Sequence, residues 1–293
     1  MTKAFKVAGH TFSLTLSDSS SLWPRLTQYD DFEVPVPEDV IFNLRLDQSL
    51  ETPADAQIAY DAPTEPGETV IRLYKYQEGW YMEMMPDASL PVCGKLFCGP
   101  GFTDARLHIC SLRMSDAIFC VNNSLMLLYA FTTASKNTLE MHASVIRHDG
   151  RGYLFLAKSG TGKSTHSQLW LDHIPGSDLL NDDNPIVRYW PEDGSVIVYG
   201  SPWSGKTPCY RNIECPVGAF VRIRRCAENR ITPLSVFESY ALLYSSCSGF
   251  KADEKMADAL HVTLEGCVVN APSFVLDCRP DEEAAHVCYG GVK

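Results

Sequence analysis

Hydrophobic and polar residues alternate in short runs along the first hundred residues. The stretches AFKVAGHTFSLTLS (residues 4–17) and VIRLYKYQEGWYMEMM (residues 70–85) alternate about Gly9 and about Glu78-Gly79. This period-two pattern is typical of half-buried β-hairpins. Residues 106–112 predict one more strand, and residues 51–69, which are rich in proline and acidic side chains, predict a loop.

The pattern changes twice in the second part of the chain. Residues 116–135 (DAIFCVNNSLMLLYAFTTAS) predict a long buried helix, which we interpret as a connector that packs into the second half. From about residue 138 onwards, strands and helices alternate. Residues 141–157 contain two β-rich runs around Asp149-Gly150, a strong signal for a two-residue hairpin turn.

These elements predict an α/β (α+β) protein of two domains. We expect a smaller β-rich N-terminal domain over residues 1–115, a connecting helix over 116–137, and the domain that carries the chemistry over 138–293. Because the hairpin of 141–157 pairs its strands antiparallel, the sheet of the second domain is expected to be mixed. A doubly wound sheet with only parallel strands is not expected.

Composition and charge exclude several classes of function. The 293 residues carry 36 acidic and 25 basic side chains, a net charge of −11, which disfavours a nucleic-acid partner. No run of 18 uninterrupted apolar residues indicates a membrane span, and residues 1–7 lack the apolar core of an export signal. Eleven scattered cysteines without a Cys-x-x-Cys pair favour reduced thiols. We therefore expect a cytoplasmic protein.

A glycine-rich loop follows the second strand of the 141–157 hairpin. Residues 157–164 read Ala-Lys-Ser-Gly-Thr-Gly-Lys-Ser, close to the Walker A pattern, with alanine at the first glycine position. Gly160 and Gly162 can adopt positive φ, so that successive backbone N–H groups point into one concavity. Lys163 can reach the β- and γ-phosphates, and the Ser164 hydroxyl can ligate Mg²⁺.

The context of this loop favours a functional interpretation. A β-run precedes it and an amphipathic helix with Leu169, Trp170 and Ile174 on one side follows it, so the positive helix N-terminus faces the same phosphates. The alternative is a Gly/Ser loop without chemical meaning. The order strand, loop, helix makes that alternative the weaker one, and the sequence predicts a nucleotide site.

An acidic pair lies one strand–helix unit further along the chain. Asp182 and Asp183 end the short strand that contains Leu179-Leu180. Beside a nucleotide, one carboxylate can hold Mg²⁺ and the other can take a proton from an attacking hydroxyl. The alternative is a simple turn, since Asp-Asp-Asn-Pro consists of turn-forming residues. With the phosphate loop upstream, the functional interpretation is the stronger.

Two further segments carry candidate residues. His142 stands at the start of the strand that leads into the hairpin, where a satisfied core histidine is the alternative to a functional one. The Gly/Pro/Ser-rich residues 199–212 carry Trp203, Lys206 and Arg211, which could hold phosphate or a base. An exposed connecting loop explains the same composition equally well.

The segments MHASVI, FLAKSGTGKST and LLNDDNP, in this order and at these intervals, resemble the C-terminal catalytic domain of HPr kinase/phosphorylase. The loop and the acidic pair also resemble the wider phosphoenolpyruvate carboxykinase clan. The resemblance covers roughly residues 138–293 and implies a mixed-sheet P-loop kinase domain. It implies ATP at Ser159–Thr165, which comprise Ser159, Gly160, Thr161, Gly162, Lys163, Ser164 and Thr165.

The resemblance also implies roles for the remaining candidates. Asp182 is the expected base, Asp183 together with Ser164 the expected Mg²⁺ ligands, and His142 and Lys163 the supporting catalytic residues. The two aspartates could exchange roles, since a strand end can aim either carboxylate at the metal. The expected activity is an ATP- and Mg²⁺-dependent kinase that phosphorylates a hydroxyl, with serine of a protein or peptide as the acceptor.

Two other functions stay open at this point. One is a kinase of a small hydroxyl metabolite, and the other is a nucleotide-binding regulator without phosphotransfer. The presence of both Asp182 and Asp183 favours catalysis, because binding alone needs no base. The sequence also leaves open whether the protein forms a homo-oligomer.

Overall fold

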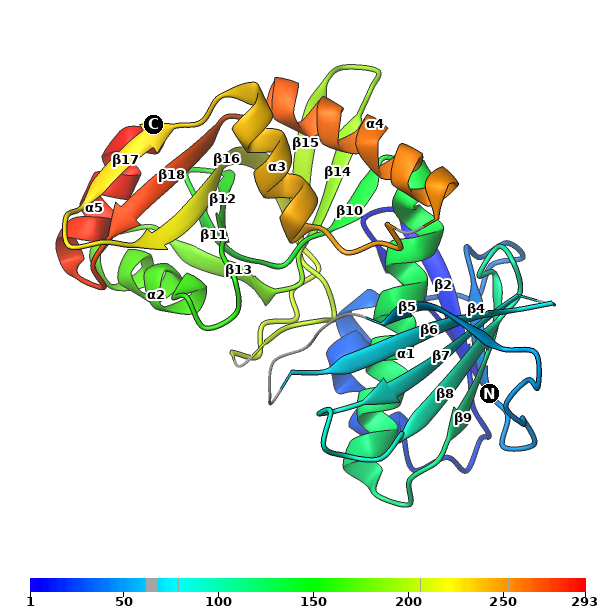
Figure 1. Ribbon diagram of the computed structural model, residues 1–293. Coiled ribbons are helices and arrows are strands. Elements are labelled where there is room, and N and C mark those ends of the chain that lie inside the picture. Colours follow the sequence, from blue (N-terminus) through cyan, green and yellow to red (C-terminus); the bar gives the residue numbers. More distant parts are fainter. Residues whose placement is uncertain (62–67, 78, 206, 252) are drawn as a thin grey trace. The chain divides into compact units, whose positions relative to one another are not determined.

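The computed structural model describes residues 1–61, 68–77, 79–205, 207–251 and 253–293. The chain forms two compact units. The first comprises Met1–Thr133 and Phe250–Glu254, and the second comprises Ala134–Gly249 and Lys255–Lys293 (Figure 1).

The first unit is a mixed sheet with one long helix. Its described strands follow the order β3-β1-β2-β4-β9-β8-β7-β6-β5, in which β2, β4 and β9 run parallel and the other neighbours antiparallel. The strands are β1 (Thr2–Val7), β2 (His10–Thr15), β3 (Glu33–Val34), β4 (Asn43–Leu46), β5 (Gln57–Asp61), β6 (Val70–Tyr76), β7 (Gly79–Met85), β8 (Gly94–Cys98) and β9 (Asp104–Ile109). Two 3₁₀ turns, Trp23–Arg25 and Thr27–Phe32, lie between β2 and β3.

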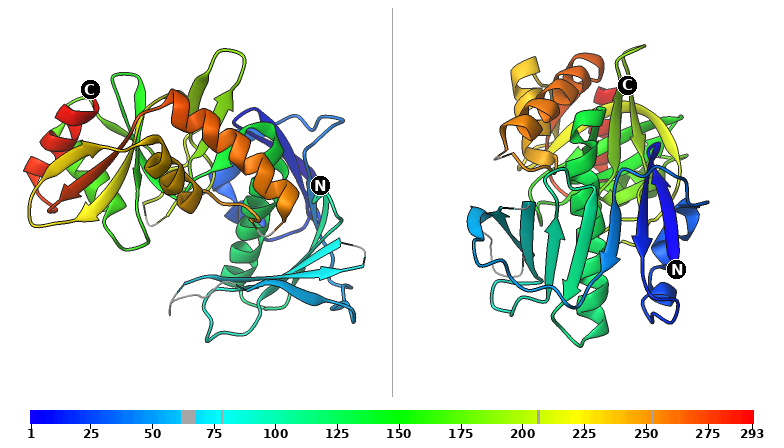
Figure 2. Two further views of the ribbon diagram at one scale, coloured as in Figure 1. Left: turned by 45° about the horizontal axis from the view of Figure 1, so that its top comes forward. Right: turned by 90° about the vertical axis from the view of Figure 1, so that its right-hand side faces the viewer.

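Helix α1 (Met114–Thr133) packs on this sheet, against β8 and β9 (Figure 2). The Tyr129 hydroxyl donates to the carbonyl of Val7 at 3.0 Å, and the Ser124 hydroxyl approaches the Met84 sulfur at 3.8 Å. The expected connector that packs into the second half is therefore wrong. The helix belongs to the core of the first unit because its small and apolar residues fit the sheet that precedes it in the chain.

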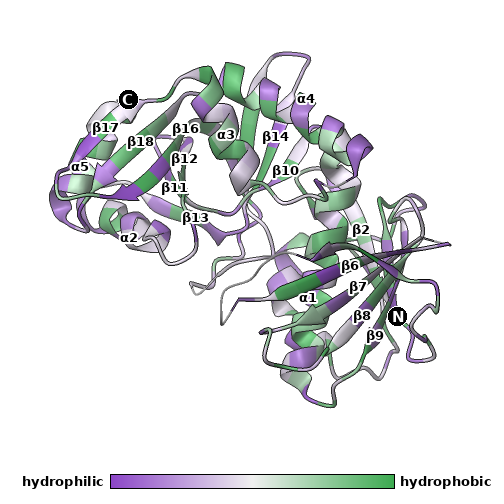
Figure 3. Ribbon diagram, viewed as in Figure 1, coloured by the Kyte–Doolittle hydropathy of each residue, from purple (hydrophilic) through white to green (hydrophobic). Residues whose placement is uncertain are grey.

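Helix α1 is apolar along much of its length, which raises the question of a membrane span (Figure 3). By length and composition alone, the helical segment Met114–Lys136 could cross a bilayer, and among the described helices it alone passes that test. Half of it is buried inside the protein, as in a core helix. The sequence-based expectation of no membrane partner stays a prediction.

The N-terminal hairpin of β1 and β2 is confirmed, with Val7 opposite His10. β6 and β7 also pair antiparallel as predicted, although Glu78 of the predicted turn lies outside the described residues. The interpretation of 51–69 as a loop is wrong in part, because β5 pairs with β6 at the edge of the sheet. All five residues of β5 are exposed, so its sequence shows no alternation of buried and exposed positions.

The second unit is a mixed sheet covered by helices on both faces. Its strands are β10 (Thr138–Glu140), β11 (Ala143–His148), β12 (Arg151–Leu156), β13 (Asp178–Asp183), β14 (Ile186–Trp190), β15 (Ser195–Tyr199), β16 (Glu214–Arg225), β17 (Arg230–Pro233) and β18 (Ser273–Cys278). Its helices are α2 (Lys163–His173), α3 (Val236–Ser246), α4 (Glu254–Asn270) and α5 (Glu282–Val292). A 3₁₀ turn, Ala134–Lys136, precedes β10.

The long strand β16 joins two groups of strands. Its first residues pair antiparallel with β15, which continues through β14 to β10. Its last residues pair parallel with β12 on one side and with β18 on the other. Beyond β12 follow β11 and β13, both antiparallel to their neighbours. The expected mixed sheet is thus confirmed.

The hairpin of β11 and β12 is also confirmed. Ala143 pairs with Leu156 and His148 with Arg151, on either side of the Asp149-Gly150 turn. Both turn residues have positive φ, 48° and 72°, as the tight turns between antiparallel strands require.

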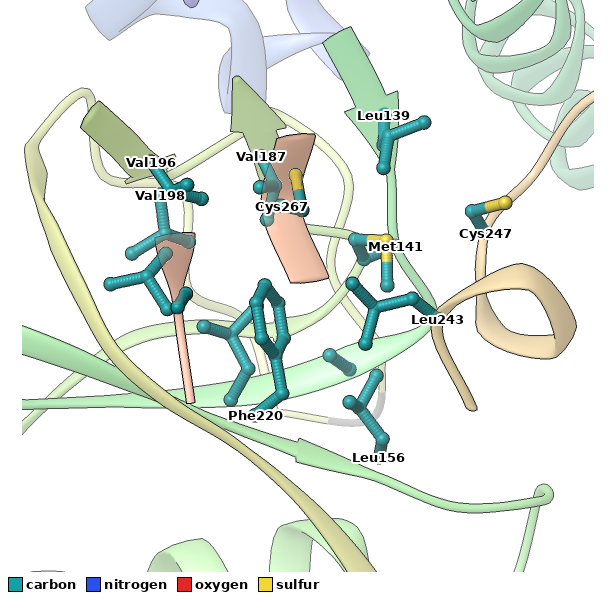
Figure 4. Packing of buried hydrophobic residues seen from close by; sticks show 14 of the residues in the cluster. Leu139, Met141, Leu156, Val187, Val196, Val198, Phe220, Leu243, Cys247 and Cys267 are labelled. Atoms are coloured by element: carbon teal, nitrogen blue, oxygen red, sulfur yellow. The ribbon is translucent and has the colours of Figure 1, made fainter. Parts of the chain in front are cut away.

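Alternate residues of β12 point to two separate cores. Leu154 and Leu156 belong to the cluster that α3 and α4 cover, with Leu243 and Phe220 (Figure 4). Tyr153 and Phe155 belong to the cluster that α2 and α5 cover, around the fully buried Trp170. Since β12 is buried on both faces, its C-terminal end, where the loop begins, is firmly packed in the core.

Candidate functional site

The glycine-rich loop leaves the C-terminal end of β12 and enters α2 at Lys163. Gly160 and Gly162 have φ of +72° and +128°, a region that residues with a Cβ rarely adopt. Gly162 is the N-cap of α2, and among the described residues no side chain caps this end. The first backbone N–H groups of the helix are therefore available to an anion. Lys158, Ser159 and Gly160 are exposed, so the loop is accessible.

Lys163 folds back over the loop. Its ammonium donates to the carbonyl of Ala157 at 3.3 Å, and the residue is 8% exposed. Burial lowers the pKa of Lys163, while the charges of Asp183 and Asp182 act in the opposite direction. The ammonium therefore lies inside the loop and close to both carboxylates.

The acidic pair lies beside the loop, at the end of β13. Asp182 Oδ1 accepts a hydrogen bond from the Ser164 hydroxyl at 2.9 Å. The other oxygen, Oδ2, is buried and has no hydrogen-bond partner among the described residues. A buried carboxylate oxygen without a partner is costly unless a donor or a cation completes it.

Asp183 faces a different partner. Its Oδ1 lies 3.3 Å from Nε2 of His142, and both side chains are partly exposed. The φ of Asp183 is 135°, unusual for a residue with a side chain. The backbone N–H of Gly205 donates to the Asp182 carbonyl, and the Ser204 hydroxyl donates to the same oxygen at 2.9 Å. These contacts hold the acidic pair in its strained conformation.

Asn181 anchors the pair from the other side. It is fully buried, its amide donates to the carbonyl of Trp203 at 3.0 Å, and its Oδ1 accepts the backbone N–H of Asn184 at 3.0 Å. Part of the 199–212 segment therefore packs against the acidic pair, through Trp203 and Ser204. Sequence reasoning missed these supports because single Asn and Ser residues carry no spacing signal.

The other two candidates of the 199–212 segment behave differently. Arg211 pairs with Asp178 at 2.9 Å, at the start of β13 and thus at the end opposite to the acidic pair. The ion pair with Asp178 therefore places Arg211 away from the acidic pair. Lys206 lies outside the described residues.

Arg225 supports the loop from β16. Its guanidinium donates to the carbonyls of Thr161 at 2.9 Å and Gly160 at 2.6 Å. With these carbonyls turned towards Arg225, the N–H groups of the same peptides can turn the other way. Arg225 stands more than 60 residues after the loop, and nothing in its surrounding sequence marks it.

A cavity of about 500 Å³ opens beside the loop, between α2 and the ends of β16 and β18. Thr161, Gly162 and Thr165 form the side next to the loop. The remaining walls are formed by His166, Leu169, Ile223, Arg225, Cys226, Cys278, Arg279 and Pro280. Apolar walls with a few polar groups, at this volume, are typical of small-molecule sites.

A third carboxyl group is buried near Asp183. Glu140, at the end of β10, is 1% exposed, and its Oε1 accepts the Ser248 hydroxyl at 3.4 Å. Burial, with a contribution from the charge of Asp183, raises the pKa of Glu140 to about 8, although the Ser248 hydrogen bond acts against the shift. No sequence pattern singles out this residue, because a glutamate at a strand end is usually exposed.

The oxygen atoms of the site can be compared with the ligands that a magnesium ion needs. Among the described parts of the chain, no group of three or more His, Cys, Asp or Glu side chains could hold a metal. Mg²⁺ at phosphate sites needs only one or two protein oxygens, because water and phosphate oxygens supply the rest. Ser164 and Asp182, with the unpartnered Oδ2, fit this requirement.

Comparisons with known proteins add little. No protein-family model matches the chain, and no curated protein sequence matches it. Among solved structures, the chain is similar to the HPr(Ser) kinase/phosphatase from Coxiella burnetii, with a TM-score of 0.31 and 11% identity over 52% of this chain and 95% of that chain. This similarity is distant.

The buried Glu140 generates a prediction about pH and stability. Between pH 4.5 and about 8, folded Glu140 keeps a proton that the unfolded chain releases, so the free energy of unfolding falls as the pH rises. Glu140→Gln removes this loss, since glutamine is isosteric and neutral. We expect the variant to exceed wild type by about 3–5 kcal/mol at pH 8 and to approach it at pH 4.5.

Denaturant unfolding of both proteins across this pH range measures the difference. Ser248→Ala is the control, because it removes the hydroxyl beside Glu140 and keeps the carboxyl group, so the pH dependence should persist. A constant difference between Glu140→Gln and wild type from pH 4.5 to 8 would show that Glu140 is charged in the folded protein.

Proposed function

We propose that the protein is an ATP- and Mg²⁺-dependent kinase that transfers the γ-phosphate to a hydroxyl group, with serine of a protein or peptide as the acceptor. The observation that carries the proposal is the contact of the Ser164 hydroxyl with Asp182, at 2.9 Å, beside the buried Lys163. It brings the loop and the acidic pair, 18 residues apart, into one site.

The contacts favour a definite division of roles between the aspartates. Asp182 accepts a hydrogen bond from the Ser164 hydroxyl, and its other oxygen has no partner among the described residues. We therefore assign Asp182 and Ser164 as the ligands of Mg²⁺. Asp183 is more exposed and pairs with His142, so we assign it the role of base. This is the reverse of the order expected from the resemblance, and one of the two arrangements that the sequence left open.

The chain's own residues can then perform the transfer. Backbone N–H groups of the loop and the Lys163 ammonium bind the phosphates and offset their charge. Asp183 accepts the proton of the acceptor hydroxyl, whose oxygen forms a bond to the γ-phosphorus while the bond from that phosphorus to the ADP oxygen breaks. His142 orients the Asp183 carboxylate through their 3.3 Å contact. When bound, Mg²⁺ supplies positive charge against the phosphate oxygens.

The cavity beside the loop agrees in size with the rest of the nucleotide. Its volume of about 500 Å³ and its apolar walls suit a base and a ribose, next to the loop residues Thr161 and Thr165. We place the adenosine there. An acceptor site would lie on the other side of the γ-phosphate, towards Asp183 and His142.

The first test of the proposal is the binding of ATP at the loop. Lys163→Ala removes a cation that contacts two phosphates, so we expect affinity for ATP–Mg²⁺ to fall by roughly 30- to 150-fold, or about 2–3 kcal/mol. Lys255→Ala, at an exposed position on α4, is the matched control and should bind as wild type does. Calorimetric titration measures all three, and equal affinities would exclude this loop as the site.

The second test separates the two aspartates and separates a kinase from a regulator. Asp183→Asn should lower turnover by roughly 10²- to 10⁴-fold with little loss of ATP affinity, because the base is lost while the side chain keeps its size and shape. Asp182→Asn should raise the Mg²⁺ concentration needed for activity, and excess metal should restore part of it.

The assay is transfer from labelled ATP to a serine-peptide pool and to a panel of hydroxylated metabolites, run beside binding measurements. Transfer only to metabolites would replace the peptide acceptor with a small molecule. Tight ATP binding by wild type without any transfer would favour a nucleotide-binding regulator. If Asp182→Asn abolishes turnover at every Mg²⁺ concentration and Asp183→Asn changes only the metal requirement, the roles are reversed.

A further inference from the structure

Arg225, the last residue of β16, binds the glycine-rich loop through two hydrogen bonds from one guanidinium group. Its Nε donates to the carbonyl oxygen of Thr161 at 2.9 Å, and its Nη2 donates to that of Gly160 at 2.6 Å. The two acceptors belong to consecutive peptide groups. Because the guanidinium is planar and its donors have a fixed geometry, a single side chain sets the direction of both carbonyls.

The two hydrogen bonds also determine where the amide hydrogens of the same peptide groups point. In a planar trans peptide the C=O and the N–H point in opposite directions, and none of the described peptide bonds is cis. The carbonyl of Gly160 shares its peptide plane with the N–H of Thr161, and the carbonyl of Thr161 shares its plane with the N–H of Gly162. Both N–H groups therefore point away from Arg225.

Of these two donors, the N–H of Gly162 is the one that is open to a ligand. The N–H of Thr161 donates to the carbonyl of Lys158 at 3.2 Å, within the loop. The N–H of Gly162 has no acceptor among the described residues, and Gly162 is the N-cap of α2. The guanidinium charge on the carbonyl side polarises the peptide, which makes this N–H a stronger donor to an anion.

We propose that Arg225 is a positioning residue for the phosphates of the bound nucleotide: it holds the loop so that the N–H of Gly162 meets a phosphate oxygen. The inference rests on the proposed function, which places the phosphates on this loop. Gly160 and Gly162 have no Cβ, so without Arg225 the peptides between them can adopt several orientations. Phosphate binding then has to order the loop, and this ordering lowers the affinity.

Two substitutions of Arg225 separate its geometry from its charge. Arg225→Ala removes both hydrogen bonds, whereas Arg225→Lys keeps the charge but loses the two-pronged donor. We expect Arg225→Ala to lower the affinities for ATP–Mg²⁺ and for tripolyphosphate–Mg²⁺ by the same factor, roughly 10-fold, and Arg225→Lys to lower both by a smaller factor. Calorimetric titration measures both ligands.

Arg222→Ala is the matched control, because it removes the same charge from the same strand. Arg222 is exposed, and the alternation of side chains along β16 places it on the face opposite to Arg225. It should bind both ligands as wild type does. If Arg222→Ala weakens binding as much as Arg225→Ala does, or if Arg225→Lys binds as wild type does, the charge alone explains the effect and the positioning role is wrong.

Tripolyphosphate separates the loop from the cavity, because it has phosphates and no nucleoside. Arg225 also lines the cavity in which we place the adenosine. If Arg225→Ala weakens the binding of ATP but not that of tripolyphosphate, Arg225 contacts the nucleoside and the positioning role is wrong, while the loop assignment stands. If wild type binds neither ligand, the proposed function fails, and the inference fails with it.

Nitrogen-15 NMR tests the two hydrogen bonds without any nucleotide. The ¹⁵N shift of an amide responds to a hydrogen bond accepted by the preceding carbonyl, so Arg225→Ala should move the amide nitrogens of Thr161 and Gly162. The indole signal of the fully buried Trp170 should stay in place and show that the variant is folded. In wild type, tripolyphosphate should move the Gly162 amide proton downfield. Unchanged Thr161 and Gly162 signals in the variant, or a Gly162 proton that bound tripolyphosphate leaves in place, would overturn the inference.

Discussion

The site depends on the pairing of strand β11 with both of its neighbours. β11 runs antiparallel to β12 on one side and to β13 on the other, so the C-terminal ends of β12 and β13 both lie beside its first residue. Ala143 is the point where they meet, opposite Leu156 in one strand and Asp183 in the other. The glycine-rich loop, the acidic pair and His142 are thereby brought together, although they are distant in sequence.

The arrangement has an energetic cost that the surrounding core must offset. Lys163, Asp182 and Glu140 are all at least nine-tenths buried, and burial of ionisable groups lowers stability unless partners compensate it. Asp183 adds backbone strain to this cost. Strand β12, packed on both faces between two apolar clusters, supplies rigid support for these groups.

Local patterns in the sequence predicted the elements but not the long-range contacts. The Asp149-Gly150 turn predicted the hairpin, and the glycines predicted a loop with positive φ, because these properties depend on a few adjacent residues. The predicted packing of α1 was wrong, since an apolar helix can pack on either of two sheets. Strand β5 was missed because the exposed edge of a sheet imposes no hydrophobic alternation.

For the candidate site too, the sequence identified the residues of local motifs but not the residues that long-range contacts bring to them. The spacing of the loop and the acidic pair drew attention to residues that do lie together, at the 2.9 Å contact of Ser164 with Asp182. Arg225 and Glu140 had no signal, because the contacts that place them beside the site come from burial and from partners far along the chain. The different surroundings of Asp182 and Asp183, one beside Ser164 and the other beside His142, likewise come from the fold and not from the local sequence.

The most direct test of the central claim is a crystal structure with a non-hydrolysable ATP analogue and Mn²⁺ in place of Mg²⁺. The account predicts phosphates on the loop with the γ-phosphate at the Lys163 ammonium, and an anomalous Mn²⁺ peak in contact with the Ser164 hydroxyl and the Asp182 carboxylate. A nucleotide bound elsewhere, or a Mn²⁺ peak away from both of these side chains, would contradict it.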